Sequence, residues 1–500
     1  MTVLRFIPSF LLGAVSVAGF APLAWYPLPI LALSALMLIW RRAADPMRCA
    51  AHGYAFGLGV FGIGVSWVYV SLADFGGMPM PLAALATALF CAVLALYPAA
   101  VGFLQQRIGG VFGLRAMVAM PALWTFCEWL RDAVTGFPWL ALGYSQGGTS
   151  PLAGYAPVGG VFFVSLMSAV AAGALAQFAA IILERGNETS GGRAGMPTAL
   201  GLLLLCVLAG SGLHRMRWSE PAGAPLKVAL LQGNVAQNLK FDEDWYDNTL
   251  ATYRKLALES DAKLIVWPET AIPRLLHRVD ADFLEDLRRR AAAKGADMLI
   301  GIPFRDGEAN YYNSVFSLGA SPTQSYSKTH LVPFGEFIPA GFDWILAILH
   351  IPMGNFARGS EQPPPLAVAG QKVAVNICYE DAFGEEIIRQ LPGATMLVNV
   401  SNIAWFGHSI APAQHLRISQ MRALETARPM LRATNTGMTA AIDEKGTVIA
   451  VLPQFAQGTL VAIVQPQSGA TPFVRWGNAP ALALALALLA CAAAFARRIS

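Results

Sequence analysis

The sequence predicts a polytopic α-helical membrane bundle of about eight helices that carries a water-exposed α/β domain. Charged residues make up only 13% of the 500-residue chain and hydrophobic residues 55%, whereas soluble proteins of this size usually contain about 25% charged residues. The shortage of charge is greatest in residues 1–213, while residues 226–465 have the composition of an ordinary soluble domain. In this second region, short apolar runs alternate with helical stretches, which is typical of a layered α/β fold.

Eight apolar stretches approach the length of about 20 residues that a membrane-spanning helix requires. They cover residues 3–21, 26–40, 52–72, 80–104, 115–131, 155–183, 196–213 and 478–496. The first stretch lacks a small-residue cleavage site and is followed at once by further spans, so we do not expect a cleaved signal peptide. We expect three parts: a membrane domain of about seven transmembrane helices (1–213), an extracytoplasmic catalytic domain (214–477), and a last transmembrane helix with a cytoplasmic tail (478–500).

The loops between these stretches predict the orientation of the chain, because an excess of Lys and Arg marks the cytoplasmic side. Alternate loops carry arginines, whereas the loops 21–25 and 73–79 contain none. The arginines are Arg41, Arg42, Arg48, Arg107, Arg115, Arg185, Arg193, Arg497 and Arg498. Both termini are therefore expected in the cytoplasm, and the domain 214–477 on the opposite side of the membrane.

Two polar or aromatic features of the apolar half leave alternatives open. Glu128 and Arg131 stand three residues apart near the end of the fifth stretch and so share one helix face. Ionisable groups at membrane depth usually face protein or a water-filled cavity, so this pair could anchor the helix end or contact a substrate. The loop Gly136-Phe137-Pro138-Trp139 could be an interfacial aromatic belt or the rim of a lipid entrance.

Charge and cysteine content narrow the function. The net charge of +4 and the lack of any Lys/Arg-rich run give no indication of nucleic-acid binding. Five of the six cysteines lie in or beside apolar stretches, without the spacing of a metal site. Cys378 is the only cysteine of the soluble domain, which therefore has no internal disulfide. Taken alone, Cys378 is either a small buried hydrophobe or a nucleophile.

The soluble domain shows a regular alternation of elements. Strands are predicted over 227–232, 263–267, 297–301, 311–318, 372–378 and 395–400, and helices over 244–259 and 281–294. Three side chains stand where such a fold places chemistry: Glu269 just past a buried strand, Cys378 at the end of another, and Lys328 in a loop. Acyl transfer needs this set, because a thiolate attacks a carbonyl, a carboxylate takes the thiol proton, and a cation stabilises the oxyanion.

Each residue alone has a plainer interpretation, since Glu269 could cap a segment, Lys328 could be a solvated lysine and Cys378 could belong to the core. Several longer motifs favour the catalytic interpretation. They are Trp267-Pro268-Glu269-Thr270, the stretch 328–337, Asn376-Ile377-Cys378-Tyr379-Glu380, the stretch 399–407, Gly136 to Leu140, and Gly143-Tyr144-Ser145-Gln146. Together they resemble, over essentially the full length, the membrane-embedded apolipoprotein N-acyltransferase family of the nitrilase superfamily.

The resemblance implies a nitrilase-like αββα sandwich with a Glu-Lys-Cys triad, here Glu269, Lys328 and Cys378. It implies a supporting glutamate at Glu336 and required positions at Tyr379 and Glu380. The implied reaction moves an acyl chain from a phospholipid, typically phosphatidylethanolamine, to Cys378 as a thioester. The chain then passes to the N-terminal amine of a diacylglyceryl-cysteine apolipoprotein, in the last step of lipoprotein maturation. The family implies a bacterial inner membrane, a catalytic domain on the periplasmic side, and no cofactor or metal.

Two positions depart from the family pattern. Ile403 stands where the family usually has Asp, and an apolar side chain cannot accept hydrogen bonds, so the geometry of that loop is open. Phe241 stands where the family often has Trp, which keeps an aromatic wall. Phe241 and Trp405 are the candidates for substrate contact. The strongly apolar segment 340–356 is too short to span a membrane and is expected to be an interfacial arm or, alternatively, a packed surface helix.

Two other functions remain as alternatives. A membrane-anchored nitrilase-type amidase would use the same triad, although a single anchor would suffice for it. A transporter or a lipoprotein-binding module with an inactive domain would be expected to lack at least one of Glu269, Lys328 or Cys378, and all three are present.

Overall fold

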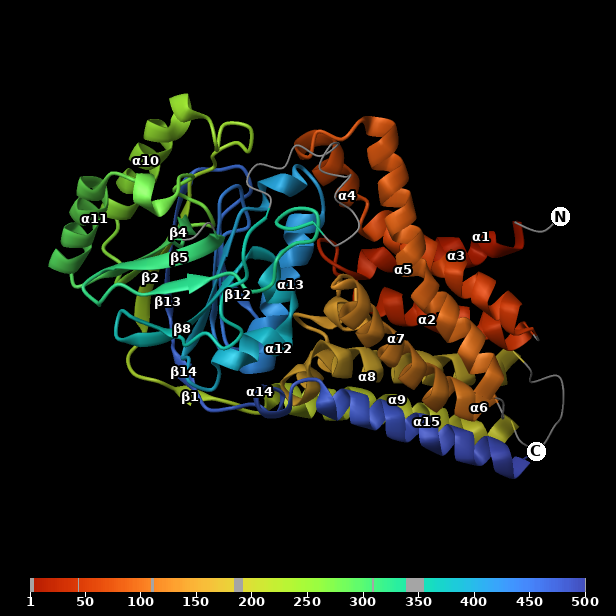
Figure 1. Cartoon of the computed structure of the whole chain (residues 1–500). Helices are drawn as coiled ribbons and strands as arrows, with labels where there is room; N and C mark the ends of the chain where they lie inside the picture. Colours follow the sequence, from red (N-terminus) through yellow and green to blue (C-terminus); the bar gives the residue numbers. More distant parts are fainter. Residues whose placement is uncertain are drawn as a thin grey trace. The chain divides into compact units, whose positions relative to one another are not determined.

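The computed structural model describes residues 4–43, 45–108, 112–183, 192–307, 310–338 and 355–499 (Figure 1). The chain forms two compact units. Unit 1 contains Met1–Val68, Ala84–Arg217 and Arg475–Ser500, and unit 2 contains Tyr69–Ala83 and Trp218–Val474. The segment 69–83, which the sequence places between two apolar stretches, therefore belongs with the later part of the chain.

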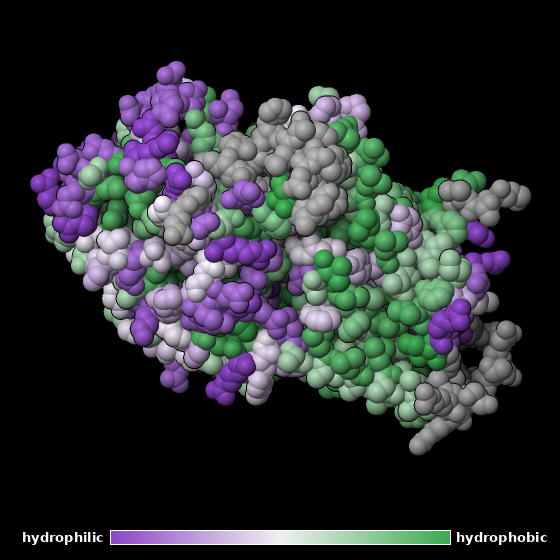
Figure 2. All heavy atoms as spheres, viewed as in Figure 1, coloured by the Kyte–Doolittle hydropathy of each residue, from purple (hydrophilic) through white to green (hydrophobic). Residues whose placement is uncertain are grey.

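Unit 1 is built from helices. They are α1 (Ile7–Ser16), α2 (Pro27–Arg42), α3 (Pro46–Gly64), α4 (Trp67–Val70), α5 (Met80–Ile108), α6 (Phe112–Leu114), α7 (Met120–Thr135), α8 (Ala156–Leu183), α9 (Gly192–Arg215) and α15 (Ala479–Ile499). The last two residues of α4 and the first four of α5 belong to unit 2. Their outer surface is largely apolar, as Figure 2 shows in green, and it includes exposed leucines on α5 and α9: Leu85, Leu89, Leu96, Leu204, Leu205 and Leu208. Such a surface would be costly in water.

Within the described ranges, fewer helices than the eight expected are long and apolar enough to cross a membrane. Three meet both criteria there: Met80–Ile108, Pro151–Leu183 and Gly195–Arg215. A fourth does so if Pro46–Gly64 and Trp67–Phe75, which are bent by 48° at their junction, count as one span. Leu4–Gly19 and Ala479–Phe495 are apolar but shorter.

The third predicted span, 52–72, differs from the observed helix at both ends. Helix α3 begins six residues earlier, at Pro46, because the Asp45 side chain accepts hydrogen bonds from the backbone N–H groups of Met47 and Arg48. An N-cap of this kind starts a helix whatever the polarity of the residues that follow. The helix then ends at Gly64 instead of continuing to residue 72.

Unit 2 contains two six-stranded sheets. The first has the order β13-β2-β3-β4-β5-β6 and the second β12-β11-β10-β9-β8-β7. The strands of the first are β13 (Gly458–Val464), β2 (Leu226–Gln232), β3 (Leu264–Val266), β4 (Asp297–Arg305), β5 (Tyr311–Gly319) and β6 (Ser325–Ser327). Those of the second are β12 (Val448–Val451), β11 (Ala440–Ile442), β10 (Met430–Thr434), β9 (Met396–Ser401), β8 (Gln371–Ile377) and β7 (Leu366–Val368). A small pair, β1 (Glu220–Pro221) and β14 (Gln467–Ser468), joins the two ends of the unit.

The sheets pack face to face and helices cover their outer faces, which gives the αββα arrangement. Val228 and Leu230 of β2 belong to the core between the sheets, together with Val375 and Val398 of the second sheet. Their neighbour Ala229 points the other way, into a second core. This alternation follows from the two-residue period of a strand. The second core includes α10 (Glu243–Leu258) and α11 (Ala281–Ala293), and a third lies between the second sheet and α13 (Ala411–Thr426). The short helices α12 (Gly384–Ile387) and α14 (Pro472–Trp476) complete the unit.

The elements predicted for the soluble domain are confirmed to within one or two residues, except that β4 continues four residues past its predicted end. Glycine in the interior of a strand usually weakens it. Here the glycine has a packing role: a Cβ atom at position 301 would lie 2.3 Å from the main-chain oxygen of Pro268 and 2.9 Å from the Cα atom of Glu269. Gly301 therefore allows the segment that carries Glu269 to lie directly on β4.

Candidate active site

The three predicted catalytic side chains follow strand ends in both sheets. Glu269 comes three residues after β3, Lys328 directly follows β6, and Cys378 directly follows β8. The carboxyl ends of parallel strands meet at one edge of a sheet, where α/β folds place their sites. The sandwich brings the two edges together. Glu380, two residues after Cys378, accepts a hydrogen bond from the N–H of Thr329, which follows Lys328. Asn402, just after β9, donates its N–H to Glu269.

Cys378 lies on a strained turn. Its φ angle is +56°, in the left-handed region that a residue with a side chain rarely adopts. A short 3-10 helix, Cys378–Ala382, begins at this residue. The Cys378 carbonyl accepts a hydrogen bond from the Asn399 side-chain amide at 3.0 Å and lies 3.3 Å from Nε2 of His415. Strain of this kind persists only where the surroundings impose it, and it is common at catalytic positions.

A buried ring of polar side chains lies behind this turn. Asp381 is 2.7 Å from Nε2 of His415 and accepts hydrogen bonds from Ser419 at 2.5 Å and from Arg432 at 3.1 Å. Arg432 also donates to Asn399, which closes the ring at the Cys378 carbonyl. The ring thus holds the backbone of the Cys378 turn through its carbonyl group.

Lys328 stands between two carboxylates. Its Nζ atom is 2.8 Å from both side-chain oxygens of Glu336 and 3.8 Å from Oε1 of Glu269. The Lys328 side chain is only 1% exposed. Burial alone would lower the pKa of Lys328, but the charges of Glu336 and Glu269 outweigh it and hold the pKa above its usual range. Both carboxylates therefore favour the charged ammonium form of Lys328.

Two hydrogen-bond donors, one on each carboxylate oxygen, fix the orientation of the Glu269 side chain. Oε1 accepts a hydrogen bond from the Asn313 side chain at 2.7 Å, and Oε2 accepts one from the backbone N–H of Asn402 at 2.6 Å. The same Asn313 amide also donates to Glu336 at 3.0 Å, so it bridges the two carboxylates. These contacts position the carboxylate as a proton acceptor for a neighbouring group.

Glu380 joins the loop of Lys328 to the loop of Cys378. One of its oxygens accepts hydrogen bonds from the backbone N–H groups of Thr329 and His330, and the other from the N–H of Ile377. Lys328 immediately precedes the first pair and Cys378 immediately follows Ile377. Glu380 thus sets the separation of the two loops.

The surroundings of the Cys378 thiol favour its protonated form. Burial raises the pKa of Cys378 well above its ordinary value, and the charge of Glu269 raises it further, while Lys328 and Arg432 act in the opposite direction. A thiol in this setting reacts only when its proton has somewhere to go, and Glu269 faces it with a fixed carboxylate.

The other side chains predicted to take part are Tyr379, Phe241 and Trp405. Tyr379 is partly buried, with its ring edge against Phe383. Phe241 is 38% exposed. Trp405 contacts the segment 69–83: its carbonyl accepts a hydrogen bond from Ser71 at 2.9 Å, and its ring stands edge-on to Phe75. Neither aromatic candidate is placed against the triad by these contacts. The predicted arm 340–356 lies almost wholly outside the described residues, at 339–354.

Ile403 leaves the loop geometry intact. It is buried, at 2% exposure, in the short helix Ile403–Phe406. The preceding residue, Asn402, still donates its N–H to Glu269. An apolar side chain is therefore accommodated by burial at a position where the family usually has Asp.

Sequence reasoning missed several residues of the centre. Asn313 and Asn402 hold Glu269. Asn402 lies in the motif 399–407 but is not singled out by it, and Asn313 lies in none of the motifs. Lys240, a further buried cation, donates a hydrogen bond to the main-chain oxygen of Glu269 at 3.0 Å. Its position directly before Phe241 was the available signal. Among the described ranges, no group of three or more His, Cys, Asp or Glu side chains could hold a metal ion.

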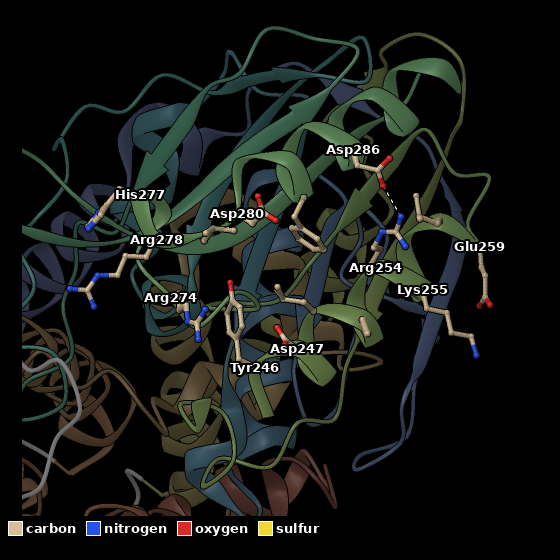
Figure 3. Close-up of a pocket in the computed structure, with 15 residues that line it drawn as sticks. Tyr246, Asp247, Arg254, Lys255, Glu259, Arg274, His277, Arg278, Asp280 and Asp286 are labelled. Atoms are coloured by element: carbon tan, nitrogen blue, oxygen red, sulfur yellow. Dashed lines mark hydrogen bonds and ion pairs between the residues drawn. The ribbon is translucent and has the colours of Figure 1, made fainter. Parts of the chain in front are cut away.

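A separate pocket of about 1010 Å³ lies on the surface between α10 and α11. Figure 3 shows its charged lining, with the Arg274 guanidinium over the Tyr246 ring at 3.6 Å and Arg254 bonded to Asp286. None of the triad residues lines it. The pocket is therefore distinct from the catalytic centre.

Comparison with known proteins adds an independent line of argument. Residues 12–174 match the family model of the apolipoprotein N-acyltransferase N-terminal domain, and residues 227–472 match that of the carbon-nitrogen hydrolases. An apolipoprotein N-acyltransferase of Nitrosomonas europaea is 49% identical, over 99% of this chain and 98% of its own length. One of Ralstonia nicotianae is 46% identical, over 98% and 93%. Among solved structures, an amidase from Nesterenkonia sp. is 18% identical, over 50% of this chain and 92% of its own, with a TM-score of 0.38.

Proposed function

The chain belongs to the apolipoprotein N-acyltransferase family, and from this premise we propose that Cys378 carries the acyl chain, with Glu269 and Lys328 as its catalytic partners. The enzyme is an acyltransferase that N-acylates lipoproteins. The observation that best supports the assignment of residues is the position of Lys328, 2.8 Å from Glu336 and 3.8 Å from Glu269, beside a thiol on a strained turn.

In the first half of the reaction, Glu269 takes the proton of the Cys378 thiol as sulfur attacks the ester carbonyl of a phospholipid. The carbonyl oxygen becomes an oxyanion, which the Lys328 ammonium stabilises. The ester C–O bond then breaks, and the leaving glycerol oxygen takes the proton from Glu269. The products are a thioester on Cys378 and a lysophospholipid.

In the second half, the N-terminal amine of a diacylglyceryl-cysteine apolipoprotein attacks the thioester carbonyl. Glu269 accepts the proton from this amine, the C–S bond breaks, and the proton returns to sulfur. The amide product leaves and the thiol is regenerated. The same three side chains thus serve both halves, as expected for a ping-pong enzyme.

Glu336 and Glu380 support this chemistry without exchanging protons in it. Glu336 fixes the Lys328 ammonium, and Glu380 fixes the two loops against each other. Tyr379, next to the nucleophile, is proposed to support it in the same way. Phe241 and Trp405 are proposed to contact the lipid substrates. No step requires a cofactor or a metal.

We further propose phosphatidylethanolamine as the acyl donor, eight transmembrane helices, and a catalytic domain on the periplasmic side of the bacterial inner membrane. Exposing an acyl chain to water costs about 0.8 kcal/mol per CH₂ group, so a lipid-handling enzyme gains from apolar helices such as α5, α8 and α9.

The arginine-bearing loops support the proposed orientation of the chain in the membrane. A reporter fused after Trp218 is expected to behave as periplasmic, and one fused after Arg185 as cytoplasmic. The opposite pattern would contradict the orientation.

The function is tested with purified protein, labelled phosphatidylethanolamine and a synthetic diacylglyceryl lipopeptide with a free amino terminus. We expect label to move to the peptide amine and lysophospholipid to accumulate in equal amount. An amidase would instead release ammonia from a small amide and leave the lipopeptide unlabelled. Replacing the donor with phospholipids of other headgroups then tests the donor preference separately.

A further inference from the structure

The catalytic centre contains more buried negative charge than the triad alone can balance. Glu269 and Glu336 both face Lys328, so two carboxylates share one ammonium. Formation of a thiolate at Cys378 adds a further negative charge unless its proton moves to Glu269 at the same moment. Negative charges close together in a buried site disfavour ionisation of the next group. Arg432 also lowers the pKa of the thiol, but it is bound to Asp381. A further cation near Glu269 would therefore help the thiolate to form.

Lys240 meets this need by its position. It lies in the turn between β2 and α10, and its side chain is buried, at 3% exposure. Its Nζ atom donates to the main-chain oxygen of Glu269 at 3.0 Å. The charges of Glu269 and Cys378 both favour the protonated form of Lys240. Lys240 thus contacts the Glu269 segment from a turn that precedes it in the chain, whereas Lys328 comes from a loop that follows it.

Burial of the Lys240 ammonium costs free energy of folding, which indicates that the residue has a role at this position. An ammonium group has three N–H donors, and in the described part of the chain the one acceptor of Nζ is the carbonyl of Glu269. A buried charge that lacks full pairing destabilises a fold by several kcal/mol. Burial lowers the pKa of Lys240 to about 8, against the opposing charges of Glu269 and Cys378. Lys240 still carries its proton for much of the time at neutral pH.

We propose that Lys240 is a positioning and charge-balancing residue of the acyl-transfer site, which acts through Glu269 and Cys378 by neutralising the surplus carboxylate charge where the thiolate forms. The inference rests on the proposed function of Cys378 as nucleophile. The groups that act electrostatically on the Cys378 thiol include Glu269, Glu336, Lys328 and Arg432. His415 lies 3.3 Å from the Cys378 carbonyl, and Lys240 contacts the main-chain oxygen of Glu269.

The test compares the effect of the charge with that of the hydrogen bond. Lys240→Gln retains an amide donor for the Glu269 carbonyl but removes the charge, Lys240→Met removes both, and Lys240→Arg retains both. Lys255→Met, at an exposed lysine of α10, is the matched control. The full-length enzyme is alkylated with iodoacetamide in detergent over a range of pH, and modification of Cys378 is followed by peptide mass spectrometry. Thioester formation from phosphatidylethanolamine is measured on the same samples.

A charge-balancing role predicts that Lys240→Gln and Lys240→Met both slow the alkylation of Cys378 at neutral pH, where wild-type Lys240 carries its proton, by about tenfold, which corresponds to about one unit in the pKa of the thiol. Thioester formation should slow by about tenfold in both. The difference from wild type should shrink above about pH 8, where Lys240 loses its own proton. Lys240→Arg should keep the wild-type alkylation rate at neutral pH, and Lys255→Met should match wild type throughout.

An alkylation rate at neutral pH that is unchanged in Lys240→Gln overturns the proposal and leaves Lys240 as a structural contact of the Glu269 loop. If Lys240→Met does not fold, the Gln and Arg variants still separate the two roles. Failure of the proposed function looks different, because wild-type Cys378 would then be alkylated normally and yet form no thioester with phospholipid.

Discussion

Both units of this enzyme bury charged side chains, and the two sets are used differently. In unit 1, Arg131 of α7 donates to the carbonyls of Phe137 and Trp139, at 2.8 and 2.7 Å. Glu128 of the same helix accepts from the Trp124 indole and from the backbone N–H of Leu142, both at 2.8 Å. In unit 2, the buried Lys328 faces Glu269 and Glu336, and all three surround a thiol.

The difference shows that burial of charge does not by itself mark a catalytic site. Glu128 and Arg131 direct their hydrogen bonds at the backbone of the loop that follows their own helix, which favours the anchoring interpretation of this pair. In unit 2, Glu269, Lys328 and Glu336 face one another although they are far apart in the chain or in separate turns, and their charges together shift the pKa of Cys378. Convergence of ionisable groups from distant parts of the chain is the more specific signal.

The sharpest distinction between the two regions is expected from Cys378→Ser. An alcohol is a far poorer nucleophile than a thiol in a site that must ionise it. Acyl transfer should fall by about 10⁴-fold or more, while insertion and the melting temperature stay close to wild type. Transfer of label from phosphatidylethanolamine to lipopeptide measures the effect. Normal turnover by this variant would remove Cys378 from the mechanism.

The next largest effect is expected at Lys328. Loss of one oxyanion donor costs about 10²–10³-fold in rate, so Lys328→Met should slow thioester formation by that factor while phospholipid affinity is retained. Lys328→Arg should also fail, because a planar guanidinium cannot place its donors where an ammonium stands. Lys263→Met, at an exposed lysine, is the control. If both Lys328 variants acylated Cys378 at near-normal rates, the triad would be reduced to a pair.

A smaller effect is expected from Gly301→Ala, which displaces the base without touching it. The added Cβ would lie 2.3 Å from the Pro268 carbonyl oxygen, so the segment with Glu269 must move. Misplacement of a catalytic group by about 1 Å can cost about 10²-fold in rate. Gly307→Ala is the matched control, because a Cβ there has no neighbour within 4 Å. Equal thioester rates for the two variants would show that the contact at Gly301 is easily relieved.

The smallest effect on chemistry is expected from Arg131→Met in unit 1. Loss of the donors to Phe137 and Trp139 leaves buried carbonyls without a partner, which costs about 1–3 kcal/mol each. The melting temperature should therefore fall, whereas the alkylation rate of Cys378 in the folded fraction should match wild type. Val134→Ala, at an exposed position of α7, is the control. A change in the Cys378 alkylation profile would instead connect Arg131 to the catalytic centre.

The sequence predicted the layered fold from short apolar runs that alternate with helices, and it suggested the triad from polar residues at strand ends together with longer motifs. All of these are local signals. It could not predict Asn313, Asn402 or Lys240, because their roles depend on contacts made only after folding, such as the N–H of Asn402 donating to Glu269. The start of α3 was missed because a single N-cap, Asp45, outweighed hydropathy. The assignment of the segment 69–83 to unit 2 likewise depends on tertiary contacts such as that of Ser71 with Trp405.

The most direct test of the central claim is the intact mass of the purified enzyme after incubation with phosphatidylethanolamine. We expect a single acyl-sized adduct that maps to Cys378, is released by hydroxylamine as a thioester should be, and disappears when the lipopeptide acceptor is added. It should be absent from Cys378→Ser and strongly reduced in Lys328→Met. An unmodified mass under conditions in which the lipopeptide becomes acylated would contradict the account, because transfer would then proceed without an enzyme-bound acyl group.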